Sequence, residues 1–254
     1  MTVEFETREH VAIITLNRPE ARNAINGEMA AGIESAIDRI ESDSSLWCAI
    51  ITARGSVFSA GADLKEISAG RANVISSPTG GFAGITTKRR TKPLIAAVNG
   101  PALAGGCEIV LACDLCVASD QAVFGLPETK RSLVAAGGGL FRLPRAIGMA
   151  VATEVMLTAE PISAQRCLQL GMINSVVPED KVLDAALDLA ARIVKNAPLA
   201  VFASLGVIKG AFDKSEQELW SDSMRAFQTI LKSEDFREGP RAFIEKRAPA
   251  WKGK

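Results

Sequence analysis

The sequence predicts an α/β protein in which helices cross over a mostly parallel sheet. Short apolar runs typical of buried strands alternate with helix-like stretches over the first two-thirds of the chain, and helical spacing alone follows. A chain of 254 residues is long enough to bury a large core, and the spread of its apolar residues indicates one main domain.

A predicted hairpin and a helix open the chain. Residues 3–6 and 11–16 predict two strands, and His10 falls in the turn between them. Residues 29–40 predict an amphipathic helix, because isoleucines recur along one face.

Three further strands and one helix follow in alternation. Apolar runs at residues 48–53, 94–98 and 115–118 predict strands, and a helix starting at Gly105 separates the last two. This order indicates parallel strands joined by crossover helices. Residues 68–91, rich in Ser, Thr and Gly, predict either a mobile loop that borders a pocket or a plain solvated loop.

Beyond about Pro161 the pattern becomes helical. Gly171 and Pro178 punctuate this part of the chain. Apolar residues recur at helical spacing in four segments, which are residues 163–170, 180–194, 198–212 and 215–231.

The charge balance argues against several classes of partner. Lys plus Arg and Asp plus Glu each number 29, so no net charge draws the protein to nucleic acid or to an anionic membrane. An anionic ligand must therefore be held by local groups. No apolar run is long enough to span a bilayer, and the first residues lack a basic, hydrophobic signal segment, so we expect a cytoplasmic protein.

The five cysteines and the single histidine do not predict a metal site. Cys113 and Cys116 have the spacing of a metal or redox pair, but a second pair is missing and His10 lies far away in the sequence. Cysteines in an apolar context behave as small hydrophobic residues. We therefore expect no bound metal and no His-based catalytic triad.

The most informative segment joins a predicted strand to a predicted helix. The turn Asn99-Gly100-Pro101 ends the strand, and Gly105, Gly106 and Glu108 fall in the first turn of the helix. The first N–H groups of a helix lack internal partners and carry partial positive charge, so they can stabilise an oxyanion. Taken alone, the glycine pair fits a tight packing turn better.

A second turn of small residues follows the predicted strand at 48–53. Ala60, Gly61 and Ala62 precede a helix-like stretch and offer backbone N–H groups with little side-chain bulk in front of them. The two turns can converge on one carbonyl oxygen.

Several motifs, taken in their order along the chain, carry a resemblance to a known family. They are residues 16–25, 58–64, 99–108, 124–128, 137–144 and 242–247. In this order they resemble the crotonase (enoyl-CoA hydratase) superfamily over essentially the whole chain. The resemblance implies the crotonase fold, a ClpP-like spiral of ββα repeats followed by a C-terminal helical region for trimerisation.

The same resemblance implies a division of labour along the chain. Residues 1–195 would form the spiral core with the active site. Residues 196–254 would form the helical region, which mediates subunit contacts and covers a neighbouring active site. We expect a homotrimer or a homohexamer built as a dimer of trimers.

The resemblance also implies the catalytic groups. In the family's hydratases two glutamates face each other across the bound acyl group, and Glu108 and Glu128 fall on the matching positions. Taken alone, Glu128 is better explained as a helix-start carboxylate favoured by the helix dipole. The backbone N–H groups of Ala62 and Gly105 correspond to the oxyanion hole.

Contacts with coenzyme A follow from the same correspondence. CoA is part of the substrate, so no separate cofactor is implied. Arg22 and Lys246 suit exposed surface charges equally well. The predicted contacts are Arg22, Ala24, Ala60, Asp63 and Leu64, with Phe243 and Lys246 reaching the ligand of a neighbouring subunit.

The chain departs from the family pattern after Glu128. Many hydratases have Gly at the position of Ser132 and Pro-Gly at those of Ala135 and Ala136. Ala136 can still donate its N–H to a water, but a positive φ would cost it energy. This stretch also resembles members related to carnitinyl-CoA dehydratases, which leaves the acyl chain open.

Hydration of a conjugated thioester explains why two acids are needed. Water must attack Cβ as a hydroxide-like nucleophile, and Cα must receive a proton. We expect an enoyl-CoA hydratase that converts a trans-2-enoyl-CoA to a 3-hydroxyacyl-CoA, with Glu108 activating the water and Glu128 exchanging the Cα proton. The alternatives are an enoyl-CoA isomerase, a carnitinyl-CoA-dehydratase-like enzyme, or a non-catalytic acyl-CoA-binding or RNA-binding member. Two acids favour hydration, and a basic surface expected of an RNA-binding member is not evident.

Overall fold

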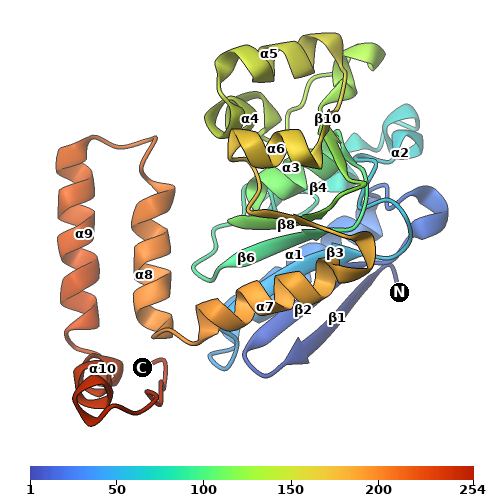
Figure 1. Ribbon diagram of the computed structural model, residues 1–254. Coiled ribbons are helices and arrows are strands. Elements are labelled where there is room, and N and C mark those ends of the chain that lie inside the picture. The colour runs from blue at the N-terminus through green and yellow to red at the C-terminus, as the bar shows by residue number, and fades with distance from the viewer.

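A six-stranded sheet forms the centre of the protein in the computed structural model, which describes residues 1–254 (Figure 1). The strand order is β1-β2-β3-β6-β8-β11, in which β1 runs antiparallel to β2 and the other neighbours are parallel. The predicted hairpin and the mostly parallel sheet are therefore confirmed. The strands span Val3–Arg8 (β1), Val11–Leu16 (β2), Cys48–Ala53 (β3), Leu94–Val98 (β6), Leu115–Ser119 (β8) and Ser175–Val177 (β11).

Two smaller sheets accompany the main sheet. Strands β6 and β8 each lead, after a short connection, into a second strand, β7 or β9, and these two pair in parallel in a three-stranded sheet with β10. Helix α3 follows directly on β7, which makes one complete strand–strand–helix unit. The short strands span Ala102–Leu103 (β7), Val123–Gly125 (β9) and Ile162–Ser163 (β10), and Ser76–Ser77 (β4) pairs with Gly81–Phe82 (β5).

Helices cover both faces of the main sheet. Side chains alternate along a strand, so Ile14 belongs to the larger core with helix α1 (Gly27–Ser42), whereas Ile13 packs in the smaller core with helix α7 (Val182–Val194). Helix α3 (Gly105–Ala112) contributes to the larger core. Helix α3 thus packs in a core shared with the buried central strands.

The helix boundaries follow local capping signals. Helix α1 starts two residues before its predicted position because the Asn26 side chain accepts the N–H of Met29 at 2.9 Å. Residues 68–91 contain the short 3-10 helix Ala72–Ile75 and the β4–β5 hairpin. The remaining elements are the 3-10 helices Pro19–Ala21, Pro127–Arg131 and Glu179–Lys181 and the helices Leu64–Ser68 (α2), Ala164–Leu170 (α6), Pro198–Lys209 (α8) and Glu216–Ile230 (α9).

Beyond Pro161 the chain is mainly helical, as predicted, but the helices begin earlier and two short strands lie among them. Helices α4 (Gly139–Ile147) and α5 (Met149–Thr158) precede that residue, and strands β10 and β11 follow it. Three glycines at the start of α4 and Pro144 inside it disguise the helical pattern, because both residue types normally end helices. Pro240 likewise disguises α10 (Glu234–Glu245).

The C-terminal helices stand apart from the sheet. Helices α8 and α9 run side by side, and α10 lies below them at the far end from α3 (Figure 1). Helices α7 and α8 meet at a bend of 105°. No single helix is long and apolar enough to cross a membrane, although this bent pair reaches the required length and composition together.

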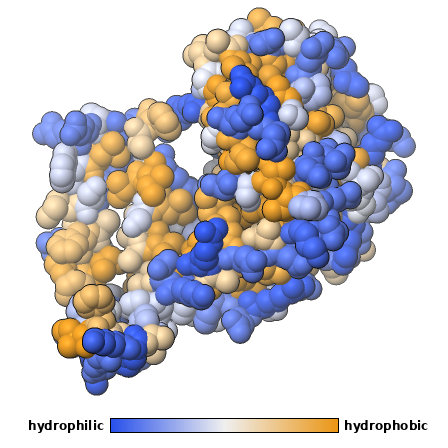
Figure 2. All heavy atoms as spheres, in the orientation of Figure 1, coloured by the Kyte–Doolittle hydropathy of each residue, from blue (hydrophilic) through white to orange (hydrophobic).

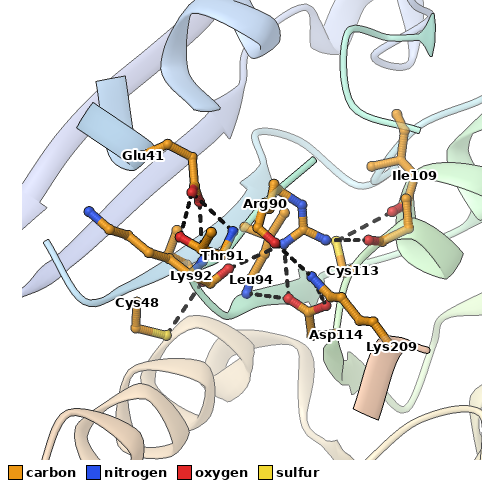
Figure 3. A network of polar contacts seen from close by, with 12 residues as sticks. Glu41, Cys48, Arg90, Thr91, Lys92, Leu94, Ile109, Cys113, Asp114 and Lys209 are labelled. Atoms are coloured by element: carbon orange, nitrogen blue, oxygen red, sulfur yellow. Dashed lines mark hydrogen bonds and ion pairs between the residues drawn. The ribbon is translucent and has the colours of Figure 1, made fainter. Parts of the chain in front are cut away.

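A buried charge cluster ties α8 to the core (Figure 3). The Asp114 carboxylate binds Arg90 at 2.9 Å and Lys209 of α8 at 2.9 Å, and it accepts the Leu94 N–H at 2.9 Å. Arg90 also donates to the carbonyl of Ala112, the last residue of α3. Asp114 and Arg90 together therefore join the C-terminal region, a central strand and the end of α3.

The cysteines take the expected place of small hydrophobic residues. Cys107, Cys116 and Cys167 belong to the larger core, and all five thiols are free. Burial raises the pKa of the Cys113 thiol to about 12, so this thiol is not ionised near neutral pH. His10 lies in the predicted turn and stacks on Trp47, with ring centroids 3.7 Å apart.

Candidate active site

A cavity of about 870 Å³ opens at the start of α3. Its walls come from α3, from residues 75–87, from the 3-10 helix Pro127–Arg131 and from the loop before α4. Residues 68–91 thus border a pocket, as predicted. The predicted site residues that line it are Arg22, Ala24, Ala60, Ala62, Leu64, Gly105, Glu108, Glu128 and Ala136.

The two glycine turns meet at the wall of this cavity. A Cβ placed on Gly61 would lie 2.7 Å from the Gly105 nitrogen and 2.8 Å from the Ala104 Cβ. The N–H groups of Ala62 and Gly105 donate no hydrogen bond within the protein. Two backbone donors without a partner thus belong to residues that line the same cavity, as an oxyanion site requires.

The first turn of α3 is held in an unusual backbone conformation. Ala104 has φ 51° and ψ −130°, a region that residues with a Cβ rarely adopt. Its N–H donates to the carbonyl of Gly125 in β9 at 2.9 Å. Gly105 itself packs under the Phe82 ring, where any Cβ would lie 2.4 Å from ring carbons. A side chain at position 105 would therefore displace the Phe82 ring.

The Glu108 carboxylate lies in the first turn of α3 and is only 4% exposed. One carboxylate oxygen accepts the Gly139 N–H at 2.9 Å. A Cβ on Gly137 would lie 2.6 Å from the other oxygen. Burial raises the pKa of Glu108, while hydrogen bonds from Gly139 and Gly137 and the charge of Arg142 act in the opposite direction.

Glu128 occupies a different environment across the cavity. It lies in the first turn of the 3-10 helix Pro127–Arg131, and one of its buried carboxylate oxygens has no hydrogen-bond partner. Burial is the main cause that raises the pKa of Glu128 to about 7, and the charge of Glu108 raises it further. Glu128 therefore holds a proton more readily than Glu108, which has backbone donors to stabilise its anion.

The structure does not support a water-positioning role for Ala136. Its N–H already donates to the carbonyl of Val134 at 2.9 Å. The positive φ in this stretch falls instead on Ser132, at 55°, and on Gly138, at 109°. This explains why glycine suits the position of Ser132, and it removes the conformational objection to alanine at 136.

Asp63 does not line the cavity, in contrast to the prediction of a CoA contact. Its side chain accepts the Lys65 N–H at 3.0 Å as the N-cap of α2, and it pairs with Arg18 at 2.7 Å. These contacts make Asp63 a residue that fixes the second turn. Phe243 and Lys246 belong to α10 and its C-cap and do not line this chain's cavity, so their contact with a neighbouring subunit stays a prediction.

Sequence reasoning missed several residues of the cavity and its support. Lys130 and Arg131 are exposed cations in the cavity wall next to Glu128. Their position directly after Glu128 in the sequence could have indicated that they line the site. Phe82 lies in a segment expected to be a loop. Arg142 touches the cavity only through the carbonyls it binds, and nothing in its local sequence reveals that contact.

Comparison with known proteins places this site in a family. The sequence profile of the enoyl-CoA hydratase/isomerase family matches residues 6–254. The chain is 39% identical over 256 residues to mevalonyl-coenzyme A hydratase of Aspergillus fumigatus, covering 98% of this chain and 94% of that protein. It is 42% identical over 246 residues to carnitinyl-CoA dehydratase of Salmonella arizonae, covering 94% of each.

Solved structures agree with this assignment. A crystal structure of an enoyl-CoA hydratase from Mycobacterium tuberculosis H37Rv superposes with a TM-score of 0.95 at 42% identity, covering 100% of this chain and 99% of that one. Such agreement confirms the predicted crotonase fold with its helical C-terminal region. The chain therefore belongs to the enoyl-CoA hydratase/isomerase family of the crotonase superfamily, and it is an acyl-CoA hydro-lyase.

Proposed function

We propose that the protein hydrates trans-2-enoyl-CoA thioesters to 3-hydroxyacyl-CoA. The observation that carries this proposal is the placement of Glu108 and Glu128 in one cavity with the unpaired N–H groups of Ala62 and Gly105. Hydration needs a base for water, an acid for Cα and a site for negative charge on the thioester oxygen. Residues that can supply all three line the same cavity.

The thioester oxygen would bind the two backbone donors. As water adds to Cβ, negative charge moves through the conjugated system to that oxygen, and donors fixed by the fold stabilise it without rearranging. Loss of one such donor costs about 3 kcal/mol in typical cases. The strained Ala104 and the Phe82 ring would hold the Gly105 donor in place.

The environments of the two acids assign their roles. Glu108, which accepts the N–H of Gly139, would act as the base that takes a proton from the attacking water. Glu128, with a pKa of about 7 and an oxygen without a partner, would supply the proton to Cα. The reverse assignment would ask the better stabilised anion to donate a proton.

The cavity wall divides into a charged part and an apolar part. The exposed side chains of Arg22, Lys130 and Arg131 would meet the phosphates of CoA. Ile67, Ile75, Phe82, Leu133 and Val134 would surround the acyl chain. The globally neutral protein would thus bind a polyanionic substrate through local charge.

Dehydration of a specialised 3-hydroxyacyl-CoA is the second candidate. Two relatives at about 40% identity are named for mevalonyl-CoA and carnitinyl-CoA, whose acyl groups carry polar substituents. Ser76, Thr86 and Thr87 line the same cavity and would offer hydroxyl groups to such a chain. The same two acids would serve this reaction, because it is the reverse of hydration.

The C-terminal helices support the proposal of a homotrimer or homohexamer. Helix α9 buries none of its residues in the single chain, and α8 buries only Pro198. Apolar side chains gather along these helices (Figure 2), among them Ile208, Trp220, Met224 and Phe227. Exposed apolar surface of this kind is typical of subunit contacts. Light scattering coupled to size-exclusion chromatography would give the subunit number.

Loss of enoyl absorbance with a panel of enoyl-CoA chain lengths would test the proposed function. We expect turnover by the wild type and a loss of about 100-fold or more in Glu108→Gln and in Glu128→Gln, since each removes one proton-transfer group. Glu154→Gln, which changes an exposed carboxylate on α5, is the matched control and should keep full activity. Undiminished turnover in either active-site variant would exclude the two-acid mechanism. Tight CoA binding without turnover would favour a binding protein.

A further inference from the structure

Arg142 of α4 lies behind the cavity and is fixed by two carbonyl groups. One guanidinium nitrogen donates to the Thr86 carbonyl at 2.6 Å, and another donates to the Gly137 carbonyl at 3.3 Å. A Cβ on Gly138 would lie 2.6 Å from the second nitrogen. The guanidinium is therefore enclosed by the two segments that it joins.

Each of these segments supports part of the candidate active site. Gly137 begins the turn whose Gly139 N–H binds the Glu108 carboxylate. Thr86 follows Phe82, whose ring packs on Gly105 beside the backbone donor. Arg142 thus connects the loop that holds the base to the segment that confines the oxyanion turn.

Arg142 has no acidic partner within ion-pair distance. The acid whose charge it feels is Glu108, and the other groups that act on it are Arg90, Arg145 and the Cys113 thiol. Burial lowers the pKa of Arg142, but the guanidinium remains charged at neutral pH. Glu108 is in turn faced by Glu128 across the cavity. A buried cation without a direct counterion therefore stands behind the proposed base.

We propose that Arg142 is a positioning residue for the hydration reaction, holding the Gly137–Gly139 turn against the Glu108 carboxylate and placing a positive charge behind that carboxylate. This inference rests on the proposed function. The planar guanidinium binds two carbonyls at once in a fixed geometry, which a lysine ammonium does not reproduce. Arg142 acts through Glu108 and does not touch the substrate.

The variants Arg142→Met and Arg142→Lys test the two parts of this role. In Arg142→Met we expect kcat to fall about ten- to hundredfold with KM changed less than about twofold, because the base is misplaced while CoA contacts remain. The acidic limb of the kcat profile should move upward by about one pH unit, since the stabilising charge is gone. In Arg142→Lys the acidic limb should stay close to its wild-type pH, because the positive charge is kept. Activity should still fall, because lysine does not bind both carbonyls as the planar guanidinium does.

The control is Arg145→Met on the same helix. Arg145 pairs at the surface with Asp213, so its loss should leave the acidic limb and kcat unchanged. A merely structural role for Arg142 would lower activity in both of its variants without moving the limb, or would raise KM, and either result overturns the proposal.

A direct titration separates this proposal from the proposed function. Glu108 can be followed by carboxyl-carbon NMR, with Glu108→Gln identifying its resonance. If the wild type hydrates no enoyl-CoA, the proposed function fails. A higher Glu108 pKa in Arg142→Met would even then show that the guanidinium acts on Glu108. An unmoved Glu108 titration in Arg142→Met refutes that role even in an active hydratase.

Discussion

The buried proton of Glu128 predicts a measurable dependence of stability on pH. The folded protein raises the pKa of this carboxyl from 4.5 to about 7, mainly by burial. The folded state therefore binds the proton more tightly than the unfolded chain does between these two values. The free energy of unfolding must then fall as the pH rises through this window. The whole of this loss of stability is present above about pH 7.

Glu128→Gln removes this cost while it keeps the shape of the side chain. The pKa of Glu128 differs by about 2.5 units between the folded and unfolded states. At about 1.36 kcal/mol per unit, this difference lowers the free energy of unfolding by roughly 3 kcal/mol above pH 7. The variant should therefore be more stable than the wild type by up to that amount at pH 8. At pH 4, where the carboxyl is protonated in both states, the two proteins should be equally stable.

Thermal unfolding of both proteins across pH 4 to 8 provides the assay. For a chain of this size, about 3 kcal/mol raises Tm by roughly 6–12 °C. Glu20→Gln, which changes an exposed carboxylate, is the control for a simple change in net charge. A Tm difference that is constant over the pH range, or that has the opposite sign at pH 8, would refute the reasoning.

Three further outcomes follow from the site. The kcat of hydration should decline above about pH 7, as Glu128 loses the proton it supplies; a rate that keeps rising to pH 9 would contradict the acid role. Ala104→Gly should stabilise the protein by about 1 kcal/mol in denaturant unfolding, because glycine adopts φ 51° without strain; equal or lower stability would show that the turn is not strained. Gly137→Ala should lower kcat about 100-fold, since its Cβ would lie 2.6 Å from the Glu108 carboxylate; a fully active variant would mean that the carboxylate position is not critical.

The sequence predicts best where a single physical rule dominates. The runs at 48–53 and 94–98 match β3 and β6 because fully buried parallel strands read as continuous apolar segments. Helices α4 and α10 were missed because each contains a proline, which normally ends a helix. In the folded protein, tertiary packing outweighs this local preference. Local pattern therefore located the sheet and left part of the helical layer undetected.

The candidate site divides in the same way. Gly105 and Glu108 stood out because the turn and the helix start are adjacent in sequence, but their roles, like that of Glu128, required the family resemblance. Asp63 forms an ion pair with Arg18, and the N–H of Ala136 donates to the Val134 carbonyl. Neither contact can be read from the sequence.

The charge cluster at Asp114 connects helix α8 to the end of α3 that lies opposite the candidate oxyanion turn. Lys209 and Arg90 share one carboxylate, and Arg90 in turn holds the last carbonyl of α3. Helix α3 is eight residues long, about 12 Å from end to end, and its opposite end carries the oxyanion turn. The position of α8 is therefore connected, through three side chains and one short helix, to the backbone donors of the candidate site.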